Sequence, residues 1–573
     1  MYIDTVPNRN SRPAVLLREG WREGGKICKR TLANLTEWPA HKVELLRRVL
    51  RDEPLVAPED AFAIERSLPH GQVEAVLAMI RHLGVDTLLG AKRSPERDLV
   101  VAMIVERLIY PCSKLATTRL WHSTTLAQEL GVEEADEEGL YAALDWLLER
   151  QERIEKKLAA RHLREGGQVL YDVSSSYYEG HTCPLMQFGH NRDGKRDLPI
   201  VVYGVLTDAE GRPVAVEAYP GNTADPSTVP DQVETLKGRF GLERVVLVGD
   251  RGMLTQTQID TLRTYPGLGW ISALRNEKLR QLAEEGVLQL SLFDVQNLAE
   301  IQSPSFPDER LVACFNPLLA QERRRKRGEL LAATEAALTK IQRETQRRTK
   351  TPLRAEEIGQ KVGRVITRHK MGKHFDLTIG DGQFHFTRRS EAIRQEADLD
   401  GLYVIRTSEP QAQLSPAQAV RSYKGLSQVE RAFRTLKGMD LRIRPIYHRT
   451  ETRVRAHIFL CLLAYYVEWH LRRAWASLLF DDETLPLDRH QRDPVAPATP
   501  SMAAKRKKTE RFSAEGLPIH SFHTLMAELA TRCRLLCRLT AAPDSPLITR
   551  ETEPTPLQSR ALELLRMFPV TGS

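Results

Sequence analysis

Two absences limit the classes of protein that this sequence can encode. It has only 7 cysteines in 573 residues, scattered at positions 28, 112, 183, 314, 461, 533 and 537. Such a set forms no disulfide framework and suits a reducing compartment, so we expect a cytoplasmic protein. The longest hydrophobic run, residues 458–467, has about half the length that a bilayer crossing requires. We therefore expect a buried helix there and no membrane partner, and the N-terminus lacks the pattern of a secretion signal.

The last two cysteines allow two interpretations. Cys533 and Cys537 are four residues apart, with His520 and His523 upstream, and such a group can form a zinc site. Residues 525–539 also have the pattern of an amphipathic helix, which would bury both thiols as small hydrophobic groups. The helix is the preferred interpretation, and the role of the two cysteines stays open.

Length and charge indicate a multidomain protein with an anionic partner. A chain of 573 residues is too long for one core and fits three or four domains. Lysine and arginine number 83 against 75 acidic residues, which gives a formal net charge of +8. The excess is modest, but it is clustered in runs such as 323–327 and 347–350, and clustered basic residues are typical of nucleic-acid binding.

The regions before the centre of the chain differ in periodicity. Residues 1–40 hold two β-rich runs around Gly24 and Gly25 and predict a small β hairpin. Residues 41–165 predict a helical domain, with one helix that begins at Ser94 and a second that begins at Ser113. This pair resembles a helix-turn-helix that could bind DNA in a major groove, although an all-helical packing domain is at least as good an interpretation.

One segment near the C-terminal third places a carboxylate between aromatic and basic residues. Tyr423, Glu430 and Lys437 follow one another at intervals of seven residues, so a continuous helix would present them on one face. Arg431 and Arg434 add positive charge beside Glu430. An amphipathic helix with solvated charges would show the same pattern, so this segment alone does not establish a site.

Two earlier aspartates extend the pattern. Asp172 and Asp250 each follow an apolar run, and we expect both where a buried strand meets a turn. A single aspartate in such a place is more often a turn former. Together with Glu430, however, the two can share a pair of divalent metal ions, the arrangement that phosphoryl transfer on a nucleic-acid backbone requires.

These motifs resemble those of the DDE insertion-sequence transposases with a Tyr-Arg-Glu-Lys signature. The resemblance covers roughly residues 165–475 and includes the segments around Asp172, Asp250 and 219–225, with Leu426 where many members have arginine. It implies that Asp172, Asp250 and Glu430 are the catalytic metal ligands for two Mg²⁺ ions, which Mn²⁺ can replace. It also implies that Tyr423 and Lys437 contact DNA phosphates, with Arg431 and Arg434 supplying matching charge.

The order strand, strand, strand, helix, strand, helix, strand in the central region predicts an α/β fold with a ribonuclease H-like mixed sheet. Its first part would be residues 166–275, with strands near 169–174, 200–207, 214–219, 245–249 and 270–274 and helices near 229–240 and 255–265. In such a sheet the first and fourth strands are neighbours, which would bring Asp172 beside Asp250.

The 179 residues between Asp250 and Glu430 exceed what the rest of that core can use, so we expect an inserted α+β domain at 276–400. The core would resume at 401–478, with a strand near 441–447 and a long helix at 451–475. A mobile linker at 481–515 and a helical tail would complete residues 479–573. The basic run of the insertion is a candidate DNA contact made of Arg323, Arg324, Arg325, Lys326 and Arg327, although it could also be a solvated helix face.

The sequence therefore predicts a transposase that binds double-stranded DNA at element ends and target. It would cut with a metal-dependent site, join 3′ ends and act as a homodimer. Two alternatives remain: a nuclease with the same fold and no strand transfer, and a catalytically silent DNA-binding repressor, against which the presence of all three acids argues.

Overall fold

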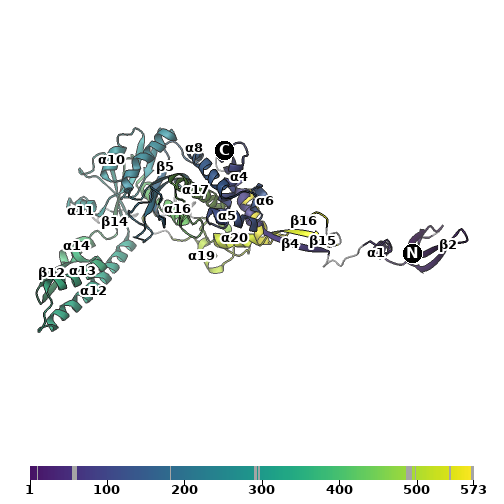
Figure 1. The fold of residues 1–573 in the computed structure, drawn as a ribbon. Coiled ribbons are helices and arrows are strands. Elements are labelled where there is room, and N and C mark those ends of the chain that lie inside the picture. Colours follow the sequence, from purple (N-terminus) through teal and green to yellow (C-terminus); the bar gives the residue numbers. More distant parts are fainter. Residues whose placement is uncertain are drawn as a thin grey trace.

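The computed structural model describes residues 1–573 except 10, 54–60, 181, 196, 289–292, 294–296, 485–492, 497–498, 541–543 and 570–573. The molecule is elongated (Figure 1). A large body occupies the middle, a helical arm projects from one end, and a small N-terminal sheet lies at the other. Among the described residues, no helix is long and apolar enough to cross a membrane.

An eight-stranded mixed sheet forms the centre of the body, in the order β10-β11-β14-β9-β8-β5-β6-β7. The five strands expected in residues 166–275 are all present: β5 (Gln168–Tyr177), β6 (Ile200–Asp208), β7 (Pro213–Pro220), β8 (Val245–Val248) and β9 (Leu268–Ala273). Strands β6, β8 and β9 are buried at every position, as expected for strands covered on both faces. The first and fourth of the five, β5 and β8, pair in parallel, which confirms the predicted neighbours.

Three helices pack against strands β5 and β7 of this sheet. Helix α16 (Ser427–Lys437) packs against β5, and α8 (Gln151–His162) and α17 (Glu451–Ala474) pack against β7. The apolar run at 458–467 lies in α17 and is buried throughout, as predicted. The predicted helices between the strands are also present, as α9 (Val229–Glu234), continued by a π-helix over Thr235–Arg239, and α10 (Gln256–Leu262).

The sheet continues into the region that the sequence assigned to the insertion. Strand β14 (Leu402–Thr407) pairs antiparallel with β9, and β11 (Arg310–Phe315) and β10 (Leu298–Ile301) follow it toward the edge. The prediction that the chain returns to the core near 402–407 is therefore confirmed. The expectation that the insertion is a separate unit from 276 onward is wrong, because β10 and β11 belong to the main sheet and α11 (Asn276–Glu284) carries Leu279 and Leu282 into a core cluster with β11 and β14.

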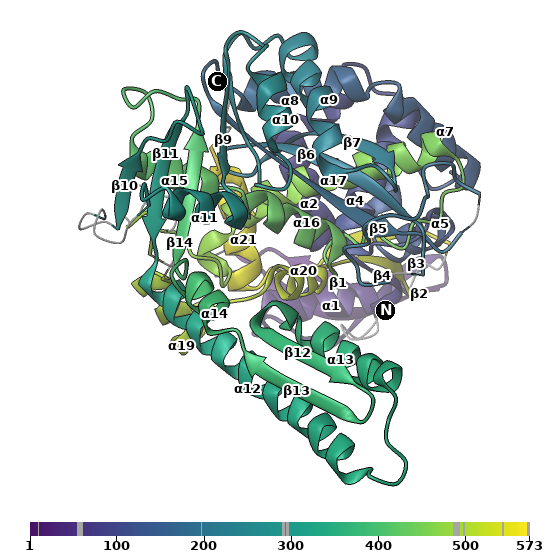
Figure 2. The same cartoon turned by 90° about the vertical axis from the view of Figure 1, so that its left-hand side faces the viewer.

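The projecting arm is built from α12 to α14 (Figure 2). The long helix α12 (Pro317–Arg347) and α13 (Ala355–His369) pack beside the hairpin of β12 (Phe375–Gly380) and β13 (Gln383–Arg388), and α14 (Ser390–Ala397) leads back to the sheet. The arm has its own small core, which includes Leu338, Ile358, Phe375 and Phe384.

The helical region before the sheet is part of the body. It comprises α2 (Gly71–His82), α3 (Val85–Leu89), α4 (Pro95–Ile109), α5 (Lys114–Leu120), α6 (Leu126–Leu130) and α7 (Glu137–Leu148). The hydroxyl of Ser94 accepts a hydrogen bond from the Arg97 amide and caps α4, as the sequence predicts. Helix α4 is buried from Asp98 to Ile109 and packs on α7 and α17, and α5 has only seven residues. These contacts favour the packing interpretation over a helix-turn-helix.

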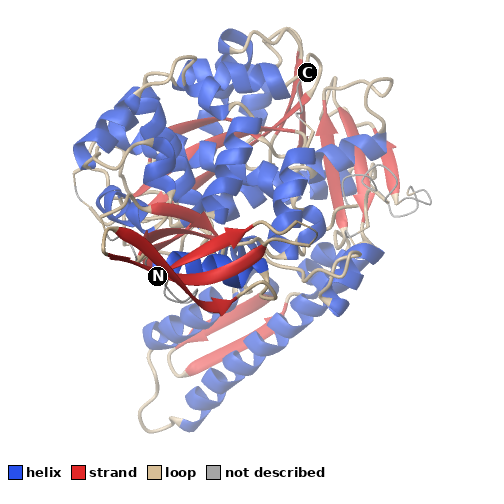
Figure 3. Ribbon diagram, turned by 90° about the vertical axis from the view of Figure 1, so that its right-hand side faces the viewer, coloured by secondary structure: helices blue, strands red, loops and turns tan. Residues whose placement is uncertain are grey.

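The N-terminal module is a three-stranded antiparallel sheet with one helix. As predicted, the hairpin of β2 (Ala14–Glu23) and β3 (Lys26–Asn34) turns at Gly24 and Gly25; both glycines adopt the left-handed region. A further strand that the sequence analysis missed, β1 (Tyr2–Val6), pairs with β2, and α1 (Ala40–Leu50) follows. Figure 3 views the molecule from the side of this sheet.

The C-terminal segment returns to the N-terminal half of the chain, which the sequence did not indicate. Strand β15 (Cys533–Leu539) lies between β16 (Ile548–Glu551) and β4 (Phe62–Pro69). The predicted helix over 525–539 is therefore wrong in its second half, since the helix there, α20 (Phe522–Ala530), ends before Cys533. Along a strand, four residues span about 13 Å, so Cys533 and Cys537 cannot share a zinc ion.

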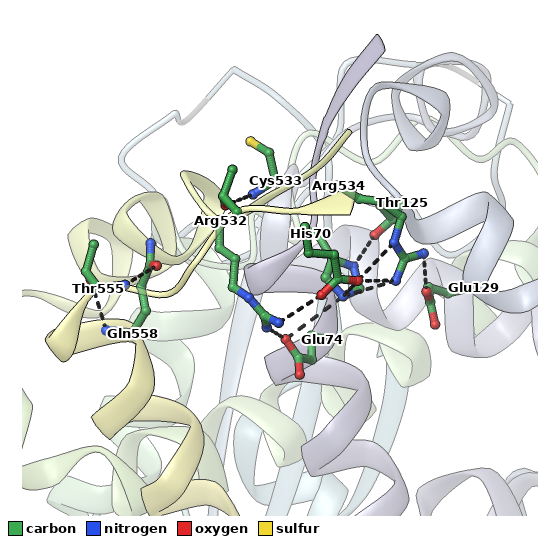
Figure 4. A network of polar contacts seen from close by, with 11 residues as sticks. His70, Glu74, Thr125, Glu129, Arg532, Cys533, Arg534, Thr555 and Gln558 are labelled. Atoms are coloured by element: carbon green, nitrogen blue, oxygen red, sulfur yellow. Dashed lines mark hydrogen bonds and ion pairs between the residues drawn. The ribbon is translucent and has the colours of Figure 1, made fainter. Parts of the chain in front are cut away.

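A network of polar contacts holds this junction together (Figure 4). The imidazole Nδ1 of His70 and the Thr125 hydroxyl are 2.8 Å apart. Arg534 from β15 binds the Glu129 carboxylate at 2.6 Å and lies 3.2 Å from His70 Nε2. Arg532 pairs with Glu74 and with Glu551 of β16. Helix α21 (Pro556–Met567) docks nearby, with the Gln558 amide donating to the carbonyl of Glu528.

Two further expectations differ from the structure. Residues 441–447 form no strand, because the chain there follows turns from the end of α16 toward α17. Of the predicted linker 481–515, residues 485–492 and 497–498 lie outside the described residues, and Met502–Glu510 forms helix α19. The ammonium of Lys507 on α19 is buried and donates to the carbonyl of Ala476 at 2.7 Å, so this part is packed rather than mobile.

Candidate active site

The two aspartates come from adjacent parallel strands. The register pairs Leu170 of β5 with Val248 of β8, and Asp172 and Asp250 each lie two residues farther along. Asp250 stands in the turn after β8, as predicted, but Asp172 lies inside β5, which continues to Tyr177. Strand β8 ends at Val248, which is opposite Leu170, so Asp172 lies beside the turn that carries Asp250. Both carboxylates therefore emerge at the same edge of the sheet.

Glu430 is brought to this edge by α16. The buried side of the helix is Val429, Ala432, Phe433 and Leu436, and the Phe433 ring packs 5.8 Å from the Tyr203 ring of β6. Glu430 is in the first turn and exposed, and its carboxylate forms no hydrogen bond or ion pair with any described residue. The helix is thus held by its apolar face while the opposite side remains available.

The other two acids influence the ionisation of Asp172. Burial, with smaller contributions from the charges of Asp250 and Glu430, raises the pKa of Asp172 to about 7, while the Val173 amide and Arg192 act against the rise. The charges of Asp250 and Glu430, residues up to 258 positions apart from Asp172 in sequence, therefore both act on the Asp172 carboxyl. That the three acids form one metal centre stays a prediction from the sequence.

The carboxylates are held by backbone amides. Oδ1 of Asp250 accepts hydrogen bonds from the amides of Gly252 at 2.9 Å and Met253 at 2.7 Å, and Oδ1 of Asp172 accepts one from Val173 at 2.8 Å. Within the described part of the chain, no three His, Cys, Asp or Glu side chains are arranged so as to hold a metal ion. The donor set nevertheless consists of hard oxygen ligands, which is the chemistry that Mg²⁺ and Mn²⁺ select.

Tyr423 is near the acids but lies on a different helix from Glu430. The predicted continuous helix is wrong, because α15 (Pro416–Lys424) ends at Gly425 and α16 begins at Ser427. Burial raises the pKa of Tyr423 to about 12, and the charges of Asp250 and Glu430 contribute in the same direction. The phenol therefore stays protonated near neutral pH and can donate a hydrogen bond at this site.

Lys437 takes part in an internal ion pair that the sequence analysis did not predict. Its ammonium lies 3.1 Å from Oδ1 of Asp193, which also pairs with Arg444. The next residue back, Arg192, binds the Asp225 carboxylate at 2.5 Å. Residues 190–193 are therefore held between β5, α16 and the loop after α16.

The other two basic residues of α16 point to solvent. Arg431 is 47% exposed in its side chain and pairs with Asp481 at 3.0 Å. Arg434 is exposed and makes no ion pair with a described residue. Arg434 is consequently the cation of this helix that is most available to an external phosphate.

The basic run 323–327 lies on α12 at the base of the arm, and its members differ in environment. Arg327 is buried and binds Asp400 through both guanidinium nitrogens, at 2.9 and 2.5 Å. Arg325 is exposed but bridges Glu322 and Glu329 at 2.7 and 2.6 Å. Arg323 donates to the Leu399 carbonyl at 3.5 Å. Arg324 and Lys326 are exposed and form no ion pair among the described residues. The run is thus not a uniform DNA contact.

Arg327 is expected to stabilise the fold. Changing Arg327 to Gln leaves Asp400 buried without its partner, and we expect the free energy of unfolding to fall by about 3 kcal/mol. Arg325→Gln is the matched control, since it removes only exposed ion pairs, and its effect should stay below about 1 kcal/mol. Urea denaturation followed by circular dichroism measures both. Equal losses in the two variants would show that the Arg327 pair is not a stabilising contact.

Two protein-family models match the chain. The "Transposase DDE domain" model matches residues 186–467, and the "IS1634 family transposase, N-terminal domain" model matches residues 3–55. The protein is a DDE-type transposase. The first match includes Asp250 and Glu430 and begins after Asp172. The second covers most of the N-terminal sheet and its helix, so it assigns to the transposase a module that the sequence analysis described only as a hairpin.

One solved structure similar to this transposase is a piggyBac transposase synaptic complex with hairpin DNA. The similarity covers 80% of this chain and 77% of that chain, at 8% sequence identity and a TM-score of 0.36. None of the curated proteins matches the chain.

Proposed function

We propose that this transposase cuts DNA at the ends of its element and joins the resulting 3′-hydroxyl ends to target DNA, using Asp172, Asp250 and Glu430 as one catalytic centre in a ribonuclease H-like core. The observation that carries the proposal is the strand arrangement. Parallel pairing of β5 with β8 brings the two aspartates to one edge, and the charge of Glu430 acts on the same carboxylate. The order β7-β6-β5-β8-β9 supports the ribonuclease H-like assignment.

The three carboxylates would hold two Mg²⁺ ions, or Mn²⁺ in their place. When bound, the ions activate the attacking oxygen and stabilise the leaving oxygen at phosphorus. The chain's own residues supply the geometry: the amides of Val173, Gly252 and Met253 fix the aspartates, and the apolar face of α16 fixes Glu430. Negative charges close to a buried carboxylate raise the free energy of the fold when no cation is bound. This cost supports a metal-binding role for the three acids.

DNA contacts would come from the residues around this centre. Arg434 and Arg431 are exposed on α16, and the Tyr423 phenol can donate to a phosphate oxygen. Lys437 would act in part through its pair with Asp193, which orients the segment carrying Arg192. Because two element ends are cut and joined together, we expect the protein to act as a homodimer on DNA. We expect it to act in the cytoplasm.

A joining assay separates this function from the alternatives. Oligonucleotides made from the DNA that flanks the coding region are supplied with a pre-cut 3′-hydroxyl, together with a supercoiled target plasmid and Mg²⁺. We expect covalent joining of the oligonucleotide to the plasmid. Cleavage of uncut ends without joining would identify a nuclease that does not transfer strands. Binding with neither reaction would identify a DNA-binding repressor.

The basic run of α12 should contact DNA only through its unpaired members. The double variant Arg324→Gln, Lys326→Gln should weaken binding to element ends and to unrelated DNA alike, because phosphate contacts carry no sequence information. The plot of log K against log salt has a negative slope. Its magnitude should decrease by about 0.9 for each DNA phosphate that the variant no longer neutralises. Arg325→Gln is the control and should leave the slope unchanged. A double variant that loses only end binding would place these residues in the end-recognition surface instead.

A further inference from the structure

A second basic region lies outside the catalytic centre, at the junction of the helical region and the chain after α16. It is a cavity of about 140 Å³, lined by α4, α5, α7 and residues 442–448. This volume is far above the roughly 10–15 Å³ that one water molecule needs. The exposed side chains of Leu115, Arg442 and Tyr447 stand at its rim, so the cavity is open to solvent.

Two cations that line the cavity are almost completely buried. Lys114 is 5% exposed and Arg107 is 6% exposed, and neither forms an ion pair with a described residue. Among the described residues, the Arg107 guanidinium donates only to carbonyl oxygens, of which that of Cys112 is the nearest at 3.2 Å, and its Nε has no partner. The Lys114 ammonium donates no hydrogen bond within the described part of the chain. Buried charges are normally paired, so this pair of cations requires an explanation.

No acid forms an ion pair with either cation among the described residues. Glu106 is near both, burial raises its pKa to about 8, and its Oε2 has no hydrogen-bond partner in the described part of the chain. His448 and His457 also face the cavity, and burial together with the charges of Lys114 and Arg107 lowers the pKa of both. Burial, together with the charge of Arg107, lowers the pKa of Lys114 to about 7. The cavity is therefore lined by two buried cationic side chains that no described acid pairs with.

The wall formed by residues 442–448 contributes two more arginines and a strained backbone. Arg442 lines the cavity with φ of 45°, in the left-handed region that a non-glycine residue rarely adopts. Such strain is concentrated at functional sites. Arg444 lines the same wall and pairs with Asp193, the partner of Lys437 on the catalytic helix. The cavity is thus connected to the catalytic centre through two ion pairs that share one carboxylate.

We propose that this cavity binds a phosphate group, with Lys114, Arg107 and Arg442 as its ligands. Arginine and lysine are the side chains that recognise phosphate oxygens, and a dianionic or diester group would supply the negative charge that the cavity lacks. The phosphate would come from the DNA strand that enters the catalytic centre, and this choice of source rests on the proposed function. Binding of phosphate as such does not depend on it.

The first test uses inorganic phosphate and the full-length protein. Phosphate at millimolar concentration, compared with chloride at equal ionic strength, should raise the melting temperature of the wild type by about 2 °C or more. Lys114→Met should abolish this shift and, in chloride, should melt at or above the wild-type temperature, because it removes a buried unpaired charge. Lys340→Met, an exposed lysine on α12, is the control and should behave as the wild type. A lowered melting temperature of Lys114→Met in chloride, or a phosphate shift that it retains, would overturn the proposal.

The second test identifies the source of the phosphate. Arg442→Gln changes an exposed residue and keeps the core intact, so its DNA binding can be compared directly with that of the wild type. If the magnitude of the slope of log K against log salt decreases by about 0.9 and the phosphate-induced melting shift is lost, the cavity binds a DNA phosphate. Loss of the melting shift with an unchanged slope assigns it to a free phosphate ion. An unchanged slope and an unchanged melting shift would contradict the site.

Discussion

Glu430→Gln is expected to abolish DNA cleavage while leaving binding to element ends nearly intact. The substitution removes a proposed metal ligand without adding bulk, and the Glu430 carboxylate has no hydrogen bond or ion pair within the described residues that its loss would break. Removing the charge should lower the cleavage rate by about 10³-fold, the upper end of the scale of one strong electrostatic contribution in a catalytic site. Gel shifts and cleavage of labelled end DNA measure the two properties separately.

The control for this variant is Glu356→Gln, which changes an exposed glutamate at the start of α13 in the arm. It should leave both cleavage and binding unchanged. Loss of end binding by Glu430→Gln as complete as its loss of cleavage would show that Glu430 supports the structure or the DNA contact rather than the chemistry.

Asp172→Asn is expected to inactivate the enzyme and to stabilise it in metal-free buffer. The Asp172 carboxylate is buried, and Asp250 and Glu430 contribute to its raised pKa, so its ionised form is disfavoured in the fold. Asparagine retains the side-chain oxygen that accepts from the Val173 amide but carries no charge. We expect the free energy of unfolding to rise by about 1–3 kcal/mol near neutral pH. Such a gain in stability with a loss of activity is the trade-off expected at a functional site.

Asp376→Asn provides the comparison for this effect. Asp376 is an exposed aspartate on β12 that pairs with Arg389, so its loss should lower stability slightly and leave cleavage unchanged. Chemical denaturation in chelator-treated buffer gives both values. A destabilised, inactive Asp172→Asn would indicate that the carboxylate is a structural hydrogen-bond acceptor instead of a member of an acidic metal centre.

The parts of the site that depend on local pattern were predictable from the sequence. Each apolar run that became β5 or β8 is buried, and parallel strands whose residues are in register necessarily place Asp172 and Asp250 at one edge. The apolar face of α16 likewise follows from the spacing of Val429, Phe433 and Leu436. These features require only periodicity and the rule that neighbouring strands connect in a consistent way.

The features that were missed depend on long-range pairing. The pattern at 525–539 is typical of a helix. Strand β15, however, pairs with β4, more than 460 residues earlier, and this pairing overrides the local preference. The same holds for charge. Nothing in the run 323–327 distinguishes Arg327 from Arg324, and only the position of Asp400 makes one a buried ion pair and leaves the other exposed.

The break between α15 and α16 has a different cause. A continuous helix through 423–437 was expected from the spacing of Tyr423, Glu430 and Lys437. Instead the amide of Gly425 is shared by the carbonyls of Arg421 and Ser422, and the chain turns before Ser427. A glycine inside a helical pattern lowers its stability, and here the pattern is divided at that residue.

The most direct test of the shared metal centre replaces Mg²⁺ with Fe²⁺ and generates hydroxyl radicals at the bound ion with ascorbate and peroxide. Radicals formed there cut the polypeptide close to the metal ligands, and mass spectrometry of the fragments locates the cuts. The account predicts cleavage near Asp172, Asp250 and Glu430 together, suppressed by excess Mg²⁺ and lost at all three places in Glu430→Gln. Cuts at only one of these segments, or a pattern that Glu430→Gln leaves unchanged, would contradict a single centre formed by the three acids.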